Sequence, residues 1–509
     1  MIKELKEALR FAASISFWRM AVFWTISLFI SYFQLHTNWI FSRRLQSYPR
    51  CHPPISESLT PVCIITGATS GLGAAAAHAL SREGFFVVLG TLLCPQLISF
   101  TFNFLDASRS ILARETRTGI ALLECPLLAS RVGRSSHLLS KIMTEIKTQN
   151  KDAHVKAFVV DLASFQSILE FKSSLQQWLL DCKLHCSLQL LINNAGILAT
   201  SSRTTPEGYD HYQTGCHDPF LNLNYPNLPN AKRLTAVGFE YFLSFAPFVL
   251  VVTMSFSVLK FLLTSSLVFL RMMGTNYIGP FCLTKLLLPL LKRSPVPSRI
   301  VNVTSFTHQS GEYLSRCRVL YILQCLRNRG KDPHITTLVH FPSVFDVQVD
   351  KESVSGTRFL RSEQYPFARL YEYSKLFLIL FSYELHRQLG LMDQPYHVSV
   401  NAADPGSVKT NIMREVPSCL SSLAFQVLKS LGLLQSPKNG VSCLIDAALA
   451  PPEASGVYFF GGKGRTVDSS VLSHNTKLAK ELWDISDNLF MEASLAFKET
   501  ASSESDNWL

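Results

Sequence analysis

Residues 62–73 read Val-Cys-Ile-Ile-Thr-Gly-Ala-Thr-Ser-Gly-Leu-Gly, and they lead into an alanine-rich stretch at 74–80. The apolar run predicts a buried strand, the glycines a tight turn, and the alanines the start of a helix. Glycines let a backbone approach a phosphate closely, and the first N–H groups of a helix point at that phosphate. The stretch therefore predicts a phosphate-binding turn in an α/β fold, although such glycine spacing alone also occurs in structural turns.

Further motifs follow in order along the chain. An apolar run ends in Asn-Asn-Ala-Gly at 193–196, and a second run at 299–305 ends in Thr-Ser. Tyr-Glu-Tyr-Ser-Lys occupies 371–375, and Asp-Pro-Gly precedes a threonine at 404–410. On a helix, Tyr371 and Lys375 share one face, so the ammonium group is expected to lower the phenol pKa from about 10 toward neutral pH.

The glycine spacing and the order of these motifs resemble the short-chain dehydrogenase/reductase family. The resemblance implies a doubly wound, Rossmann-type parallel sheet with helices on both faces. It implies that Tyr371 is the acid/base, that Ser305 orients the substrate oxygen, and that Lys375 tunes Tyr371 and holds the cofactor ribose. Asn276 matches the helix asparagine that supports a proton-relay water. Cys182 and Cys186 have no second cluster of ligands, so no metal is expected.

The resemblance also implies a dinucleotide site. In the family a Gly-Arg pair directly follows the second strand; here that strand starts at 85–89 and the pair appears only at Gly133-Arg134, where Arg134 could pair with a 2′-phosphate. NADP(H) is therefore favoured over NAD(H). Asp161 resembles an adenine-contacting aspartate. The residues implied at the cofactor are Gly67, Thr69, Ser70, Gly71, Leu72, Gly73, Arg134, Asp161, Leu162, Asn194, Ala195, Gly196, Tyr371, Lys375, Pro405, Gly406 and Thr410.

Three segments interrupt the family-like sequence, at about 90–131, 211–270 and 310–342. Removing them restores continuity, and we interpret them as translated introns or another gene-model artefact, with true loop expansions as the alternative. The uncharged stretch 241–259 is long enough to span a membrane. A span there would separate Asn194 from Asn276, which the resemblance brings to one site, so no span is expected.

The amino terminus carries a second signal. Residues 20–42 contain no Asp, Glu, Lys or Arg and are long enough to cross a bilayer. A hairpin or an amphipathic helix lying on the membrane is the alternative, and basic residues on both sides leave the orientation open. We divide the chain into an anchor and linker at 1–60, a dehydrogenase domain at 61–489 and a polar tail at 490–509. The domain is expected to face the cytosol, with the endoplasmic reticulum favoured over other organelles.

Composition sets broad limits on function. The net charge of +11 suits anionic lipids and cofactor phosphates, and it does not require nucleic acid. The 12 cysteines show no disulfide-framework spacing, which favours a reducing compartment.

The connection between Ser305 and Tyr371 is longer than in small soluble members of the family. It resembles the membrane-associated, retinol-dehydrogenase-like group, including the member named for the X chromosome. The substrate is thus expected to be a hydrophobic alcohol, aldehyde or ketone. A catalytically impaired nucleotide sensor or scaffold at a membrane is the alternative function, and a homo-oligomer stays open.

Overall fold

The computed structural model describes residues 2–40, 47–53, 60–91, 126–182, 186–201, 271–310, 349–361, 365–391 and 397–506. In these ranges the strands are β1 Val62–Thr66, β2 Phe86–Thr91, β3 Val155–Val159, β4 Leu190–Asn193, β5 Ser298–Val303, β6 Val398–Asp404, β7 Ser407–Val408, β8 Leu434–Gln435 and β9 Val457–Phe460. The α-helices are α1 Ile2–Ala12, α2 Ile15–Trp18, α3 Thr25–Ile40, α4 Gly71–Arg82, α6 Pro126–Gln149, α7 Phe165–Asp181, α9 Arg271–Met273, α10 Gly279–Lys292, α12 Lys351–Ser355, α13 Phe367–Gly390, α14 Ser418–Ser430, α15 Pro437–Ala448 and α16 Thr476–Asp506. Shorter π or 3₁₀ segments are η1 Arg19–Trp24, η3 Gly274–Ile278, η4 Phe306–Gln309, η6 Thr357–Arg361, η7 Asn411–Met413 and η8 Val471–His474.

The predicted doubly wound sheet is confirmed in the described part of the chain. Its strands are parallel in the order β3-β2-β1-β4-β5-β6-β9. Ile64 in β1 pairs with Val88 on one side and with Leu191 on the other. Every residue of β1 is buried, as expected for a parallel sheet covered on both faces. The strand order reverses direction at β1 and β4, which opens a crevice at their carboxyl ends.

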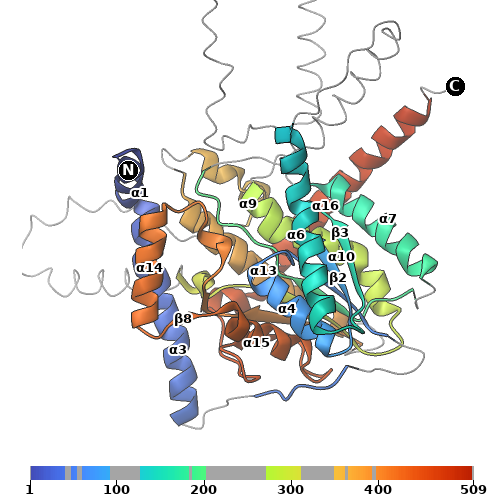
Figure 1. The fold of residues 1–509 in the computed structure, drawn as a ribbon, viewed down its shortest axis with the longest axis horizontal. Coiled ribbons are helices and arrows are strands. Elements are labelled where there is room, and N and C mark those ends of the chain that lie inside the picture. The colour runs from blue at the N-terminus through green and yellow to red at the C-terminus, as the bar shows by residue number, and fades with distance from the viewer. Residues whose placement is uncertain are drawn as a thin grey trace, which may run out of the picture.

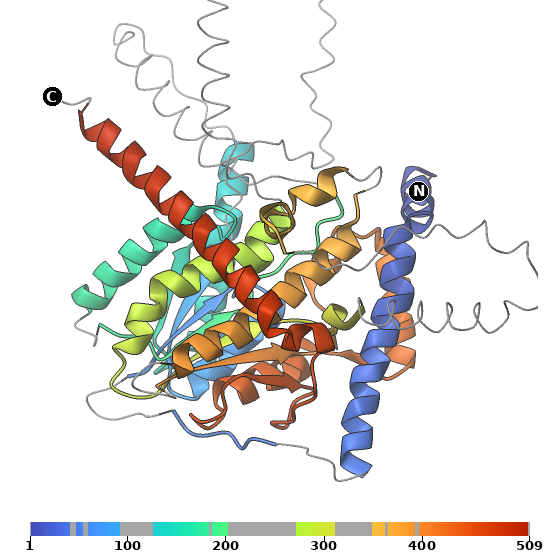
Figure 2. The same ribbon diagram turned by 180° about the vertical axis from the view of Figure 1, so that it is seen from behind.

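Helices cover the two faces of this sheet. Helices α4, α6 and α15 lie on the face turned toward the viewer in Figure 1. Helices α10, α13 and α16 lie on the opposite face, which Figure 2 presents. Separate apolar clusters fill the two interfaces, one built around Leu80 and Ile146 and the other around Phe281 and Phe377. The sheet is thereby held between two cores, so the carboxyl ends of its strands are fixed relative to one another.

The amino-terminal helices lie along the domain that contains the sheet. Segments α1, α2, η1 and α3 follow one another in a rod beside α14 in both views (Figures 1 and 2). Leu28 and Leu35 are buried against Tyr458 and Phe460. Residues Ile15–Thr37 are long and apolar enough to cross a membrane, with a mean hydropathy of 1.3. This candidate span starts and ends earlier than the predicted 20–42.

Several boundaries differ from those predicted. Strand β2 continues to Thr91 and α6 begins at Pro126, so both ends of the first predicted insert are regular structure. The remainder of that insert, residues 211–270 and nearly all of 310–342 lie outside the described residues. Helix α16 continues to Asp506, across the boundary predicted at 490. Its buried leucines Leu478, Leu482 and Leu489 lie before that boundary.

Candidate active site

The glycine turn has the conformation that its sequence predicts. Gly67 and Gly71 adopt positive φ angles of 67° and 57°, which cost a glycine little. At Gly73, which is buried, an added Cβ would lie 2.3 Å from the carbonyl oxygen of Gly67. The turn therefore leaves no room for a side chain at this position. It delivers the first turn of α4 to the carboxyl end of β1, where an anionic group is favoured.

Asn194 holds the glycine turn against the next strand. Its Nδ2 donates to the carbonyl oxygen of Thr66 at 2.8 Å, and the Thr66 hydroxyl accepts from the backbone N–H groups of Asn194 and Ala195 at 3.0 Å each. The end of β1 and the end of β4 are thus tied together by three hydrogen bonds. The side chain predicted to contact the cofactor also fixes the loop that would hold it.

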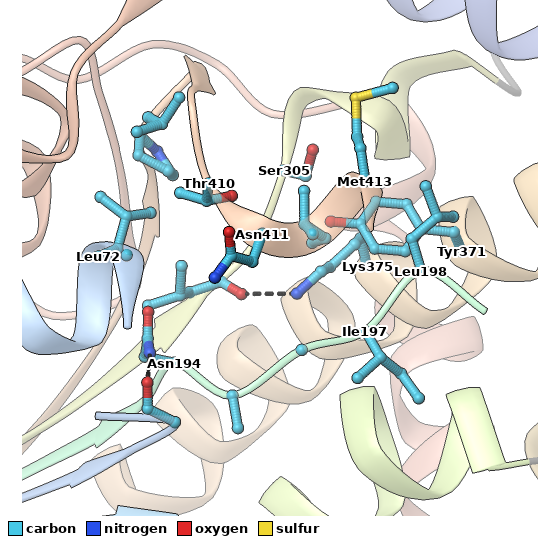
Figure 3. Close-up of a pocket in the computed structure, with 18 of the residues that line it drawn as sticks. Leu72, Asn194, Ile197, Leu198, Ser305, Tyr371, Lys375, Thr410, Asn411 and Met413 are labelled. Atoms are coloured by element: carbon cyan, nitrogen blue, oxygen red, sulfur yellow. Dashed lines mark hydrogen bonds between the residues drawn. The ribbon is translucent and has the colours of Figure 1, made fainter. Parts of the chain in front are cut away.

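Helix α13 brings the predicted catalytic pair to the same crevice. Tyr371 is 7% exposed and Lys375 3% exposed. The Tyr371 hydroxyl is hydrogen-bonded to the side chain of Ser305, which lies just beyond β5. Lys375 Nζ donates to the carbonyl oxygen of Val303 at 3.0 Å (Figure 3). The hydroxyl, the phenol and the ammonium group that the sequence predicted together do lie together.

The electrostatics of this pair correct one expectation. Burial and the charge of Asp404 raise the pKa of Tyr371, and the hydrogen bond from Ser305 only partly opposes this. The predicted lowering by Lys375 is wrong for this arrangement, because its Nζ lies 5.7 Å from the centre of the Tyr371 ring and donates to a backbone carbonyl instead. Burial also lowers the pKa of Lys375 to about 8, against the attraction of Asp404.

Asp404 is a buried carboxyl group beneath the site that the sequence did not single out. It accepts hydrogen bonds from the Tyr458 hydroxyl at 2.6 Å and from the Gly406 N–H at 2.8 Å. Burial raises its pKa to about 6, although Lys375 and these hydrogen bonds act in the opposite direction. Its position in the Asp-Pro-Gly motif was the one available signal.

Asn276 is fully buried in the π-helical segment η3. Its Oδ1 accepts from the Ile197 N–H at 2.8 Å, and its Nδ2 donates to the Ile197 carbonyl at 2.9 Å and to Ser374 at 3.1 Å. The side chain therefore joins the segment after β4 to helix α13. Its expected support of a relay water stays a prediction.

A cavity of about 400 Å³ collects most of the predicted residues. Figure 3 shows Leu72 and Asn194 at one end, and Tyr371 with Leu198 and Met413 at the other. The predicted residues that line the cavity are Gly67, Thr69, Ser70, Gly71, Leu72, Asn194, Ala195, Gly196, Ser305, Tyr371, Lys375, Pro405, Gly406 and Thr410. The glycine turn and these polar groups therefore form a set that fits a dinucleotide.

Of the predicted cofactor residues, four are not among those that line this cavity in the described part of the chain: Gly73, Arg134, Asp161 and Leu162. Asp161 Oδ1 accepts from the Ala163 N–H at 2.9 Å, and its Oδ2 pairs with Arg271 at 3.2 Å. Leu162 packs under Gly279, where an added Cβ would lie 2.2 Å from the Leu162 carbonyl oxygen. Both residues contact the helices that start at Arg271, and a contact with adenine stays a prediction.

Arg134 is separated from the end of β2 by the first predicted insert. It lies within helix α6, and its side chain is outside the described residues. The predicted pairing with a 2′-phosphate therefore stays a prediction.

The cavity also has residues that sequence reasoning missed. Trp24 from η1 lines it, together with Ile412, Met413 and Arg414 from the segment after Thr410. From the sequence alone, Trp24 was one residue of the predicted apolar span at 20–42. Nothing in the linear spacing indicated that it would meet Tyr371.

Comparison with known proteins gives relatives but no domain assignment, since no protein-family model matches the chain. Polyprenol dehydrogenase from Homo sapiens is 24% identical over 443 residues, which cover 85% of this chain and 88% of the relative. Retinol dehydrogenase 14 from Mus musculus is 31% identical over 217 residues, which cover 42% of this chain and 50% of the relative. Among solved structures, salutaridine reductase from Papaver somniferum aligns over 78% of this chain and 99% of its own, with 16% identity and a TM-score of 0.38.

Proposed function

This chain belongs to the short-chain dehydrogenase/reductase family, and on that premise we propose that it is an NADP(H)-dependent oxidoreductase acting on a lipophilic alcohol, aldehyde or ketone. The observation that carries the proposal is the meeting of Tyr371, Ser305 and Lys375 with the glycine turn in one cavity. Without the turn, a tyrosine and a lysine at helical spacing would be ordinary neighbours. Without the tyrosine, the turn would indicate nucleotide binding alone.

Each side chain has a role that follows from its position. When bound, the nicotinamide supplies or accepts the hydride. In the reductive direction Tyr371 donates its proton to the carbonyl oxygen, and in the oxidative direction it accepts the proton of the alcohol. Ser305, hydrogen-bonded to Tyr371, holds the substrate oxygen and stabilises the charge that develops on it. Lys375, which lines the same cavity, would bind the ribose hydroxyls of the cofactor.

A lipophilic substrate is supported by the apolar end of the cavity. Trp24, Leu198, Ile412 and Met413 line it around Tyr371. The two relatives are named for polyprenol and retinol, which are isoprenoid alcohols. An apolar substituent would bury its surface at this end while its oxygen meets Ser305.

The cofactor preference and the location are parts of the same proposal. NADP(H) is supported by the sequence pair Gly133-Arg134, since a guanidinium group can bind a phosphate through two hydrogen bonds. Membrane attachment is supported by the candidate span Ile15–Thr37. A catalytic domain facing the cytosol from the endoplasmic reticulum would take its substrate from that membrane.

Binding and turnover test the proposal. Full-length protein in detergent should bind NADPH more tightly than NADH, as measured by cofactor fluorescence, and should reduce an isoprenoid aldehyde. Tyr371→Phe should keep NADPH binding and lose about 10²–10⁴-fold in kcat, because it removes the proton donor. Tyr373→Phe, two residues along the same helix, is the matched control and should remain active. NADPH binding without turnover by the wild type would favour a nucleotide sensor instead.

A further inference from the structure

Trp24 stands against the catalytic tyrosine. Its ring centroid lies 5.4 Å from that of Tyr371, at an interplanar angle of 41°. It is the one residue from the described amino-terminal helices that lines the cavity. Its indole Nε1 donates to Oε1 of Glu372 at 2.8 Å, so the ring is oriented by the residue that follows Tyr371 in the chain.

Arg19 fastens the same carboxylate to the amino-terminal rod. Its Nε lies 2.8 Å from each oxygen of Glu372, and its Nη2 donates to Oε2 as well. Glu372 is 4% exposed, and the Arg19 side chain is 12% exposed. Breaking a buried ion pair is strongly destabilising, because it leaves a buried charge without a partner. Arg19 and Glu372 therefore hold η1 in one position on α13. The orientation of Trp24 is therefore fixed from two sides.

The face of α3 that packs on the sheet-containing domain also makes specific hydrogen bonds. Ser27 Oγ lies 3.1 Å from Ser310 Oγ, and both residues are fully buried. Tyr32 accepts a hydrogen bond from Gln435 Nε2 at 3.0 Å. The outward face of the rod carries exposed apolar residues instead, among them Trp18 of α2 at 59% and Phe33 of α3 at 67%. One face of the rod thus belongs to the catalytic domain, and the other is free for a bilayer.

We propose that Trp24 is a specificity-determining residue for the substrate, with its indole forming an aromatic wall against an unsaturated isoprenoid chain beside the reacting carbon. The inference rests on the proposed function and deepens it. Figure 3 places Met413 and Leu198 next to Tyr371, at the end opposite Leu72 and Asn194. Trp24 lines the cavity with them, so the amino-terminal helix is part of the substrate site as well as a membrane attachment.

The test compares Trp24→Ala, Trp24→Phe and the matched control Trp18→Ala in full-length protein in detergent. Trp18 is on the same rod but faces outward. KM and kcat are measured with NADPH for a C15 isoprenoid aldehyde and for butanal. Trp24→Ala should raise KM for the isoprenoid aldehyde about tenfold relative to KM for butanal, the equivalent of 1.4 kcal/mol. Trp24→Phe should recover most of the loss, and Trp18→Ala should behave as wild type.

A binding measurement separates this inference from the proposed function. The affinity of a C15 isoprenoid alcohol is measured in the presence of NADP⁺, which requires no turnover. Weaker binding by Trp24→Ala alone supports the aromatic wall even if the wild type reduces neither aldehyde, in which case only the proposed activity fails. Equal losses for both aldehydes, or isoprenoid binding unchanged by Trp24→Ala, would overturn the role of Trp24.

Discussion

At the scale of single residues, the glycine turn gives the sharpest steric test. An alanine at Gly73 would place Cβ 2.3 Å from the Gly67 carbonyl oxygen and 2.5 Å from Asn194 Nδ2. We expect Gly73→Ala to cost about 1–3 kcal/mol of stability and to weaken NADPH binding at least about tenfold, because the turn must shift. Calorimetry and cofactor fluorescence measure the two effects.

Gly390 provides the matched control for that change. It ends α13, and a Cβ there would meet nothing within 4 Å. Gly390→Ala should leave NADPH binding unchanged and alter stability by no more than about 1 kcal/mol, in the stabilising direction. Equal cofactor losses in both variants would show that the turn geometry is not the cause.

The buried carboxyl group of Asp404 predicts a pH dependence. Its folded pKa is about 6, above its ordinary 3.8, so between these values the folded chain binds more protons than the unfolded chain. This group therefore contributes a stability that is present below about pH 4 and is lost as the pH rises through 6. Asp404→Asn should not show this loss. Its free energy of unfolding should therefore rise by about 2–3 kcal/mol relative to that of the wild type when the pH is raised from 4 to 7.5. Urea unfolding at both pH values measures the difference, and a constant difference would refute the prediction.

At the scale of elements, the amino-terminal rod depends on Arg19 and Glu372. Arg19→Met leaves the buried carboxylate without its guanidinium partner, which we expect to cost about 3–5 kcal/mol. The double variant Arg19→Met with Glu372→Met should recover much of that loss, because no charge is then stranded. A double-mutant cycle by urea unfolding measures the coupling. Additive effects would mean that the pair does not hold the rod.

The elements also show why some predictions from sequence were confirmed and others were not. Strand β1 and the turn at Gly67 are local, since apolar burial and glycine conformation are set by the residues themselves. The pKa of Tyr371 is not local. It depends on the burial of the Tyr371 side chain and on the charge of Asp404, which lies in strand β6. Neither can be inferred from the helical spacing between Tyr371 and Lys375.

At the scale of the whole molecule, the described chain breaks off beyond the carboxyl ends of β2, β4 and β5. These ends share the edge of the sheet that carries the cavity. Strands β1 and β4 lie before residue 201, and β5 lies after residue 271. The pairings of β4 with β1 and with β5 therefore involve no residue of 211–270. Loop entropy grows only slowly with length, so a long connection at this edge is compatible with the sheet.

Deletion of the predicted insert 211–270 follows as a test of this organisation. We expect the shortened protein to keep its circular dichroism spectrum, its cooperative unfolding and its NADPH affinity within about twofold, because the sheet and the glycine turn are built without it. Failure of the shortened chain to fold would contradict the interpretation of 211–270 as an insert.

The sequence by itself determined the strand, turn and helix at 62–80, the order of the motifs and the identity of Tyr371, Ser305 and Lys375 as partners. Short-range sterics and hydrophobic patterning are sufficient for the strand, the turn and the helix, since these are properties of neighbouring residues. The partnership of Tyr371, Ser305 and Lys375 came instead from the resemblance of the ordered motifs to the short-chain dehydrogenase/reductase family. Tertiary structure alone decided that Trp24 meets Tyr371, that Arg19 pairs with Glu372 and that Asp404 lies beneath the site. These contacts join residues distant in the chain, and only the packing of the rod on α13 and the burial of β6 bring them within reach.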